Sequence, residues 1–367
     1  MRILFVIRDM VTGGAGKQLA LTANALAEKG HSVAVYTYFG GPLEHKLAKD
    51  VQYIAQTPVP TNKIAEYILS PIHIRKTIKK LHPDIVVSWR CNAGCFTVLA
   101  SIGLDVKTIF SERTDPYTET SLALKISAFV CGFSDGGVFQ LEKVRQYYKR
   151  LANKSIVIHN PFDENIWVTG NIPYVNRLKD IVFVGRIFLP QKRQDLALAV
   201  FKVFLKKNPN YTLHFYGDGC DFEKVKILAS QYGLNNDVVF HGSEKNIPEK
   251  IKNAKCLLLT SAYEGIPNVI LEAFAAGVPV VATDCSPGGA RMLIGDNENG
   301  LITKKDDALS IAETMDKLVN DEKLAEVFIK NGRIRLLDFQ PRKIFDKWNE
   351  YLENINRPSF VKKNQSV

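Results

Sequence analysis

The sequence predicts an α/β protein with two Rossmann-like domains. The chain has 367 residues, which is more than one ordinary domain requires. It opens with an apolar stretch at 2–7, a glycine-rich segment, an amphipathic segment and a second apolar stretch at 32–38, the order of a β-α-β unit. A second alternation of apolar stretches and amphipathic segments starts at residue 180. Two consecutive α/β domains explain both alternations.

We assign residues 1–162 to the first domain. Short apolar stretches are typical of buried parallel strands, which we expect at 2–7, 32–38, 84–88, 108–112 and 155–159. A glycine-rich turn is expected at 12–17. The spacing of apolar residues predicts helices at 17–29, 70–81, 122–133 and near 140–152. The helix at 122–133 is unusually apolar, so we expect it in the core, a membrane-docking surface being the alternative.

The predicted helix at 70–81 has a basic side. Pro71 suits its first turn, where the missing N–H of proline costs no hydrogen bond. The apolar residues at helical spacing, which we expect to be buried, are Ile74, Ile78 and Leu81. The basic residues expected on the outer face are Arg75, Lys76, Lys79 and Lys80. A solvated face is the ordinary interpretation, and contact with anionic lipid is the alternative.

We assign residues 163–340 to a second domain, with a polar linker at 163–179. Its strands are expected at 180–185, 212–217, 238–241, 256–261 and 278–282. Its helices are expected at 193–207, 222–232, 306–320 and 322–337, with a further helix that starts near Pro267 and ends at Gly277. A last helix is predicted at 341–356, and the polar tail 357–367 is predicted to be disordered.

The composition favours a cytoplasmic globular protein. The hydrophobic fraction is 46% and the charged fraction is 23%, as in ordinary globular domains. No apolar run approaches the ~20 residues of a membrane-spanning helix. The first residues are charged too early for a secretory signal, and we expect them to form a strand. The six cysteines show no paired metal spacing, so we expect reduced thiols.

The positive charge is concentrated in the first half of the chain. The net charge is +10; residues 1–160 hold 20 Lys and Arg against 12 Asp and Glu, a net of +8, which leaves +2 for residues 161–367. A basic half suggests a polyanionic partner. No nucleic-acid motif accompanies this charge. We therefore expect an anionic membrane surface or a lipid diphosphate as the partner, and no nucleic acid.

The segment from Glu264 to Glu272 has the features of a nucleotide pocket. Glu264 lies in a loop before a predicted helix, whose N-terminal N–H groups favour a phosphate. Glu272 lies inside that helix, where a carboxylate can accept hydrogen bonds from the two hydroxyls of a ribose. Two glutamates eight residues apart are common on solvated helices. The neighbouring turn, proline and small residues favour the pocket instead.

Three basic residues follow the strand predicted at 180–185. Arg186 comes directly after it, and Lys192 and Arg193 follow a short loop. Ligands of open α/β sheets bind at strand ends, so these cations can hold a diphosphate and stabilise the charge that grows on it as it leaves. The sequence leaves open whether Lys192 or Arg193 makes this contact.

These motifs resemble the signature of a known family. Glu264 and Glu272, followed by Ala-Gly-Val-Pro-Val-Val at 276–281, resemble the E-x7-E motif of retaining GT-B glycosyltransferases of family 4. The resemblance covers nearly the whole chain. It implies two domains facing a cleft, a nucleotide-sugar on the second, an acceptor on the first, and a last helix crossing back to the first domain. It also implies retention of anomeric configuration without a metal or other cofactor.

The resemblance also implies roles for individual residues. Glu264 would contact the transferred sugar, Arg186 and Lys192 the diphosphate, and Glu272 the ribose. The further residues expected around the nucleotide-sugar are Gly14, Gly16, Gly217, Ser243, Gly265, Ile266, Asn268 and Val269. Glu112 and Arg113 stand where many relatives have a histidine. This variant resembles a subgroup acting on bacterial surface polysaccharides, so both are candidates for contact with the acceptor or the sugar.

The sequence therefore predicts a metal-independent, retaining glycosyltransferase of cell-surface polysaccharide synthesis. We expect it to move a hexose or N-acetylhexosamine from a nucleotide-sugar, a UDP-sugar in the first instance, to a lipid-linked or saccharide acceptor. We expect it at the inner face of the cell membrane. The alternatives are a GT-B nucleotide-sugar epimerase and a non-catalytic nucleotide-sugar-binding subunit. The sequence does not fix the sugar, the base, the linkage or the oligomeric state.

Overall fold

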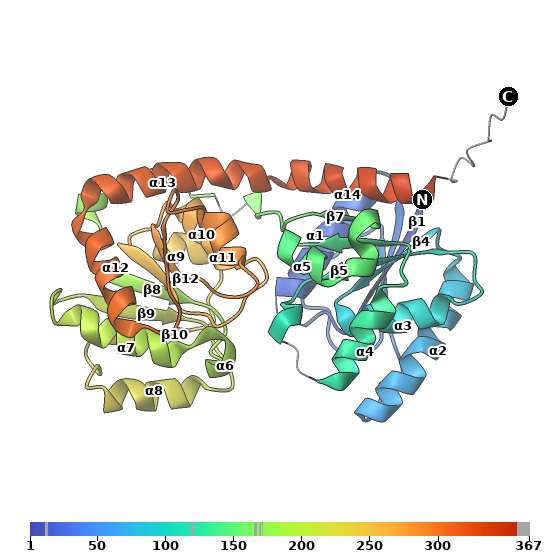
Figure 1. Ribbon diagram of the computed structural model, residues 1–367, viewed down its shortest axis with the longest axis horizontal. Coiled ribbons are helices and arrows are strands. Elements are labelled where there is room, and N and C mark those ends of the chain that lie inside the picture. Colours follow the sequence, from blue (N-terminus) through green and yellow to red (C-terminus); the bar gives the residue numbers. More distant parts are fainter. Residues whose placement is uncertain (12–13, 119–120, 165–166, 169, 171, 358–367) are drawn as a thin grey trace. The chain divides into compact units, whose positions relative to one another are not determined.

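The computed structural model describes residues 1–11, 14–118, 121–164, 167–168, 170 and 172–357. The chain forms two compact units (Figure 1). The first comprises residues 1–114, 119–158 and those from 342 onward, and the second comprises 115–118 and 159–341. The linker predicted at 163–179 and the tail predicted at 357–367 fall in part outside the described ranges.

The first unit is built on a parallel sheet. Its strands are β1 (Arg2–Ile7), β2 (Ser32–Thr37), β3 (Val51–Ala55), β4 (Ile85–Trp89), β5 (Lys107–Glu112), β6 (Gly136–Phe139) and β7 (Ser155–Val157). They lie in the order β3-β2-β1-β4-β5-β6-β7. In the centre, Phe5 of β1 lies opposite Val35 and Val87 of its parallel neighbours. Helices cover both faces of such a sheet, which explains why its central strands are apolar throughout.

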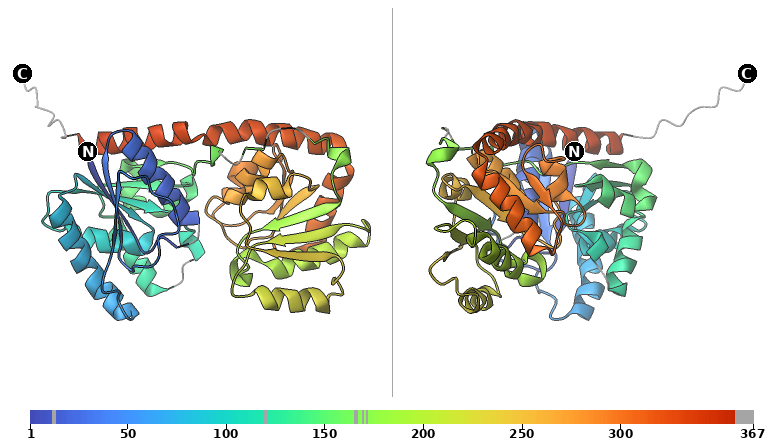
Figure 2. Two further views of the ribbon diagram at one scale, coloured as in Figure 1. Left: turned by 180° about the vertical axis from the view of Figure 1, so that it is seen from behind. Right: turned by 60° about the vertical axis from the view of Figure 1, so that its left-hand side comes forward.

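The helices of the first unit lie on both sides of this sheet. They are α1 (Gly14–Glu28), α2 (Lys63–Leu81), α3 (Cys91–Ser101), α4 (Leu122–Cys131), α5 (Glu142–Tyr147) and α14 (Pro341–Asn356). Helices α1 and α14 share one hydrophobic core with β1, β2 and β4, and Figure 2 shows α1 in dark blue against the sheet. Helix α3 packs on β4 and β5, with α2 and α4 at its sides (Figure 1).

The last helix returns to the first unit. Its apolar residues at helical spacing, all buried, are Ile344, Phe345, Trp348 and Leu352. The ring of Trp348 stacks on Trp89, with the ring centroids 5.7 Å apart. The Tyr351 hydroxyl accepts from the Gly137 N–H at 2.8 Å and donates to the Lys154 carbonyl at 2.6 Å. A helix from the C-terminal end of the chain thus completes the core of the N-terminal unit.

The second unit has its own parallel sheet. Its strands are β8 (Asp180–Val184), β9 (Thr212–Tyr216), β10 (Val238–Gly242), β11 (Cys256–Leu259), β12 (Val280–Thr283) and β13 (Leu301–Thr303), in the order β10-β9-β8-β11-β12-β13. Its helices are α6 (Leu189–Lys192), α7 (Gln194–Leu205), α8 (Phe222–Gln231), α9 (Ile247–Ile251), α10 (Asn268–Ala276), α11 (Gly289–Ile294), α12 (Ala308–Asn320) and α13 (Glu322–Leu336). Figure 1 shows α7 and α8 on one side of this sheet, with α10 and α11 on the other.

Both units are therefore Rossmann-like, as predicted, but several elements differ from the prediction. Strand β3 and helix α3 were not predicted: β3 is a partly exposed edge strand, and α3 is too evenly apolar to show a helical period. Helix α2 begins at Lys63, where Asn62 caps it by accepting from the Ala65 N–H at 2.9 Å, so Pro71 lies inside the helix. Helix α1 begins at Gly14, so only 12–13 of the predicted glycine-rich turn precede it, outside the described ranges.

Two predicted helices are broken by the backbone. The segment near 140–152 divides into α5 and a 3-10 helix at 149–154, because Tyr148 leaves the helical conformation. The segment 193–207 begins earlier, as the short α6, and Arg193 in the left-handed conformation separates it from α7.

Pro267 is the N-cap residue of α10 and not its first helical residue. Gly277 ends α10 in the left-handed conformation at φ 68°, which confirms that prediction.

Two predictions about side-chain burial are wrong. Helix α4 was expected in the core, yet its apolar residues Leu122, Ile126 and Phe129 are exposed, because the helix packs only through its other side. Arg75 was expected on the outer face of α2. Its guanidinium instead donates to the carbonyls of Ala100 and Ile102 at the end of α3, at 2.8 and 2.7 Å.

Candidate active site

The order of the second sheet marks one place as a ligand site. The strand order reverses between β8 and β11, which lie side by side although β9 and β10 come between them in the chain. In open parallel sheets, ligands bind at the carboxyl ends of the strands at such a reversal. Arg186 lies in the loop after β8 and Lys192 ends the short α6 that follows, whereas the loop after β11 carries Glu264. Topology alone thus brings the predicted catalytic residues to one edge.

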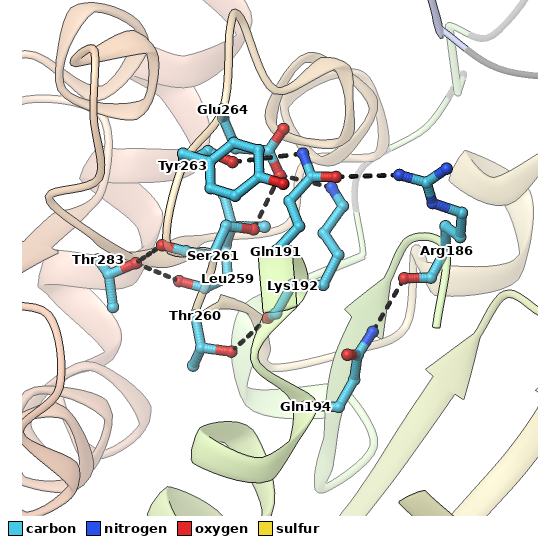
Figure 3. Close-up of polar contacts among 10 residues, drawn as sticks. All are labelled: Arg186, Gln191, Lys192, Gln194, Leu259, Thr260, Ser261, Tyr263, Glu264 and Thr283. Carbon is cyan, nitrogen blue, oxygen red and sulfur yellow. Dashed lines mark hydrogen bonds and ion pairs between the residues drawn. The ribbon is translucent and has the colours of Figure 1, made fainter. Parts of the chain in front are cut away.

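An ion pair joins the two loops. Lys192 Nζ lies 2.5 Å from Glu264 Oε1, and their side chains are only 14% and 10% exposed (Figure 3). The same carboxylate oxygen accepts from the Ser261 hydroxyl at 2.8 Å. The charges are largely shielded from water, so the carboxylate has a fixed position and a fixed donor set. A sugar or phosphate group at this edge would meet a cation and an anion already held in place.

Gln191 connects this pair to Arg186. Arg186 Nη2 donates to Gln191 Oε1 at 3.1 Å, and Gln191 Nε2 donates to the Tyr263 carbonyl at 3.3 Å (Figure 3). The main chain of Gln191 adds a third bond, since its carbonyl accepts from the Ala262 N–H at 2.8 Å. The residue Arg186 itself is exposed. Its guanidinium is therefore oriented by one bond and accessible to an anion.

Arg193 points to other partners. Its guanidinium bonds Asp195 at 3.1 Å and Asp306 at 2.5 Å. The hydrogen bond that Arg193 donates to Asp195 is the main cause that raises the pKa of Arg193, with a further contribution from Asp306. The structure therefore brings Lys192, and not Arg193, to Glu264.

Close backbone contacts shape the edge of the site. A Cβ on Gly217 would lie 2.0 Å from the Gly185 carbonyl oxygen, so the ends of β8 and β9 touch through backbone alone. A Cβ on Gly289 would lie 1.7 Å from the Gly265 carbonyl oxygen, next to Glu264. The Glu264 N–H donates to the Ser286 carbonyl at 2.8 Å. The segment 286–289 therefore supports the loop that carries Glu264.

Helix α10 starts directly after this loop. Its N-cap residue is Pro267, whose side chain makes no capping hydrogen bond. Glu272 is the fifth residue of the helix and is partly exposed. Asn268, the first residue, is also partly exposed, and its side-chain oxygen accepts a hydrogen bond from the Asn160 side-chain amide at 3.0 Å. Ile266 and Val269 are buried against the unit. The helix N-terminus, which carries a partial positive charge, thus lies next to the cluster of Lys192 and Glu264.

Both units are similar to known protein families. Residues 173–335 match the family model described as Glycosyl transferases group 1, and residues 12–165 match the model described as Glycosyltransferase Family 4. The two models together cover most of both units. The chain belongs to the glycosyltransferases of GT-B fold.

Relatives of this glycosyltransferase extend over its whole length. It is 27% identical over 367 residues to the Campylobacter jejuni GalNAc-alpha-(1->4)-GalNAc-alpha-(1->3)-diNAcBac-PP-undecaprenol alpha-1,4-N-acetyl-D-galactosaminyltransferase, covering 97% of this chain and 99% of that one. The crystal structure of Anabaena HepE in complex with UDP and glucose has a TM-score of 0.80 at 20% identity, covering 96% and 100% of the chains. The apo structure of the galactosyltransferase WaaB has a TM-score of 0.77 at 18% identity, covering 96% and 99%.

Three other predicted site residues of the glycosyltransferase belong to other segments of the chain. Ser243 is exposed after β10 in the second unit. Gly14 and Gly16 belong to the first unit, at the start of α1, where Gly14 is exposed and Gly16 is buried beside the His45 ring. Their contact with a nucleotide-sugar stays a prediction.

Glu112 and Arg113 are buried inside the first unit. The Glu112 carboxylate accepts from the Arg113 N–H, the Thr114 hydroxyl and the Tyr148 hydroxyl at 2.8, 2.8 and 2.9 Å. The Arg113 guanidinium lies 4.1 Å from the centroid of the Trp89 ring, and burial lowers its pKa to about 9. In this conformation both side chains organise the interior of the unit, and their contact with an acceptor stays a prediction.

Three residues of the site were not predicted from the sequence. Ser261 and Gln191 hold Glu264 and Arg186, and Gly289 makes the close contact with Gly265. Ser261 stands three residues before Glu264, and Gln191 directly precedes Lys192. Their closeness in sequence to Glu264 and Lys192 was the feature that could have indicated them. For Gly289 the signal was the glycine pair at 288–289.

The structure also bears on metals and membranes. Across the described ranges, no group of three or more His, Cys, Asp or Glu side chains has an arrangement that could hold a metal ion. In that same part of the chain, every helix is too short or too polar to cross a membrane.

Proposed function

We propose that this glycosyltransferase moves a hexose or N-acetylhexosamine from a UDP-sugar to a lipid-linked or saccharide acceptor in cell-surface polysaccharide synthesis. The printed names of the relatives support the substrate classes. The Campylobacter enzyme is named for transfer of N-acetylgalactosamine to an undecaprenol-linked saccharide, and Anabaena HepE was crystallised with UDP and glucose. A lipid-linked acceptor would place the enzyme at the inner face of the cell membrane, in agreement with the basic first half of the chain.

One observation carries this proposal: Lys192 and Glu264 meet at the strand-order reversal of the second sheet. When the bond between the sugar and the diphosphate breaks, negative charge grows on the diphosphate. Lys192, Arg186 and the N-terminus of α10 are positive groups suited to stabilise that charge, which lowers the barrier without a metal ion. Glu264 would then contact the transferred sugar, and Glu272 the ribose hydroxyls.

We further propose that the anomeric configuration is retained. The cluster contains one carboxylate, Glu264, already paired with Lys192 and Ser261. Attack by the acceptor on the same face as the departing diphosphate requires no separate protein base, because the leaving phosphate can take the acceptor proton. This route fits a site that offers cations and a single fixed carboxylate.

The first test is the donor. UDP-sugars and GDP-sugars are compared for their ability to raise the thermal unfolding temperature, since a ligand that binds only the folded state stabilises it. We expect UDP-sugars to protect the wild-type protein, and Glu272→Ala to reduce this protection. Protection by GDP-sugars alone would contradict the assigned base. Equal protection of the wild type and of Glu272→Ala would show that Glu272 does not belong to the site.

The second test is the reaction itself. Wild type and Glu264→Gln are incubated with a labelled donor and a membrane lipid extract, with and without EDTA. We expect labelled product from the wild type in both conditions, with the anomeric configuration of the donor by NMR. Loss of activity in EDTA that magnesium restores would contradict the metal-free route. An altered free sugar without transfer would identify an epimerase, and binding without any conversion would identify a non-catalytic subunit.

A further inference from the structure

Helix α4 presents an apolar face to solvent. Leu122, Ile126, Phe129 and Phe133, the last just beyond the helix end, are 73%, 55%, 56% and 54% exposed. Their spacing of four, three and four residues places them on one face. The opposite face, with Ser127 and Cys131, is buried against the unit. An exposed apolar stripe of this kind on a folded domain marks a contact surface.

Helix α2 carries a second stripe. Ile64, Ile68 and Ile72 are exposed along its N-terminal half, and the exposed side continues with Lys76 and Lys80. Helix α3 packs against both α2 and α4, so the three helices form one layer on the first sheet (Figure 1). The apolar stripes of α2 and α4 therefore belong to the same layer of one unit.

The exposed charged side chains of this layer are all positive. Helices α2, α3 and α4 together contain six basic residues, Lys63, Arg75, Lys76, Lys79, Lys80 and Lys125, and one acidic residue, Glu66. Glu66 is buried and bonded to Arg8 at 3.4 Å. A further cation, the Arg150 guanidinium, lies 4.7 and 4.6 Å from the ring centroids of Phe129 and Phe133. The three helices thus expose isoleucine, leucine, phenylalanine and lysine without any exposed carboxylate.

We propose that this docking face, made of the exposed residues of α2 and α4, binds the surface of an anionic lipid bilayer. Apolar side chains enter the boundary between headgroups and acyl chains, and lysines beside them meet lipid phosphates. The proposal deepens the proposed function, on which it rests, since a lipid-linked acceptor lies in a membrane.

The chemistry of the face argues against the other occupants. A nucleic acid uses cations for its phosphates but offers nothing to a stripe of exposed isoleucine and leucine. A second copy of this chain, related by a two-fold axis, would bring two surfaces of the same positive charge together, which is repulsive. Of the three, the anionic bilayer provides both an apolar interior and negative charge at its surface.

Vesicle binding tests the proposal with the full chain. Vesicles of phosphatidylcholine alone are compared with vesicles of phosphatidylcholine and phosphatidylglycerol in equal parts, across a salt series. We expect sedimentation with the anionic vesicles that weakens with salt. Replacing both Leu122→Gln and Ile126→Gln should weaken binding at least roughly tenfold, because two side chains lose burial. Replacing Lys76→Gln and Lys80→Gln should weaken it about fivefold per lysine at low salt.

A matched control uses exposed apolar residues of the second unit. Ile227→Gln with Val327→Gln changes two exposed apolar side chains of α8 and α13, and its vesicle binding should equal that of the wild type. UDP-induced thermal stabilisation of every variant shows that the fold is intact. Vesicle binding needs neither donor nor acceptor. Failure of the docking proposal can therefore be distinguished from failure of the proposed transfer reaction, since either assay can succeed without the other.

Three outcomes would overturn the proposal. The first is equal or absent binding to the two kinds of vesicle. The second is unchanged binding by the Leu122→Gln and Ile126→Gln variant, which would place the membrane contact elsewhere. The third is a dimer in sedimentation velocity that the same variant dissociates, without vesicle binding by the wild type. That result would make the face an interface between copies of the chain.

Discussion

At the scale of single residues, one ion pair joins Lys192 and Glu264, which are 72 residues apart in the chain. Lys192 belongs to the end of α6 and Glu264 to the loop before α10. Ser261 shares the same carboxylate oxygen. A buried charge that loses its partner is costly, so each member of this cluster depends on the others.

Replacing Lys192 tests its role in departure of the diphosphate. We expect Lys192→Ala to lower kcat by about 10² to 10³, since a fixed positive group that acts on growing charge contributes more in the transition state than in the bound substrate. Donor affinity should fall less. Steady-state kinetics at saturating donor measure both quantities. Arg193→Gln is the matched comparison, and a larger loss of kcat in that variant would show that Arg193 is the catalytic cation.

Replacing Gly289 tests the support of the Glu264 loop. A Cβ at Gly289 would meet the Gly265 carbonyl oxygen at 1.7 Å, and backbone cannot turn aside as a flexible side chain can. We therefore expect Gly289→Ala to move the loop, lowering kcat/KM and the thermal protection by UDP. Gly288→Ala is the control, because its φ of 106° is strained for alanine while nothing lies within 4 Å of the added Cβ. Equal losses in the two variants would assign the effect to backbone strain.

At the scale of elements, α14 contributes the buried layer that completes the first unit. Trp348 stacks on the Trp89 ring, and the Arg113 guanidinium lies 4.1 Å from the Trp89 ring centroid and 5.4 Å from that of Trp348. Ion pairs and polar contacts at the surface, such as Lys29 with Asp346 at 2.5 Å, add to this packing. The energy lies mainly in the buried aromatic residues, since exposed ion pairs contribute little.

Replacing Trp348 tests this contribution. We expect Trp348→Ala to lower the free energy of unfolding of the first unit by about 3 to 5 kcal/mol, the usual cost of emptying a large aromatic site. Denaturant titration followed by circular dichroism measures the change. Trp167→Ala removes a partly exposed tryptophan of the second unit and should cost much less. A similar loss in both variants would show that α14 is not the main stabiliser of its unit.

At the scale of the whole molecule, burial of ionisable groups couples stability to alkaline pH. Burial raises the pKa of Tyr36 from 10.0 to about 12, and the pKa of Cys256 from 9.0 to about 12. Burial likewise raises the pKa of Cys285 from 9.0 to about 12, and the charge of Glu264 adds to the effect. Arg113 has the opposite sign, because burial lowers its pKa from 12.5 to about 9.

The sign of the pH dependence follows from proton counts. Above about pH 9 the unfolded chain releases protons that Tyr36, Cys256 and Cys285 keep in the folded state, so their contribution to stability falls as the pH rises toward about 12. Arg113, Arg177 and Lys255 work in the other direction, because burial lowers their pKa values. Burial also raises the pKa of further tyrosines, among them Tyr38 and Tyr351, which adds to the fall. We expect the free energy of unfolding, measured in urea, to be lower at about pH 11 than at about pH 8. Cys285→Ala should show a smaller fall, and a rise with pH would contradict the assignment.

Much of the fold and part of the candidate site followed from the sequence alone. Apolar strands, glycine ends and alternating helices are local features, so both α/β units and the end of α10 at Gly277 could be predicted from composition and spacing. Lys192 was predicted because it follows a strand, at the edge of the sheet where ligands bind. Glu264 was predicted because it precedes a helix N-terminus and begins the E-x7-E motif.

Only the tertiary structure decided which partner each side chain finds. Whether Lys192 or Arg193 reaches Glu264 depends on the left-handed conformation of Arg193 and on Asp306, more than a hundred residues away. The exposure of α4 depends on which faces its neighbours leave uncovered, so an apolar sequence suggested core where the structure has surface. Glu112 and Arg113 turn inward because Tyr148 and Trp89 surround them. Spacing along a chain fixes elements, whereas burial and pairing depend on contacts between residues that are distant in sequence.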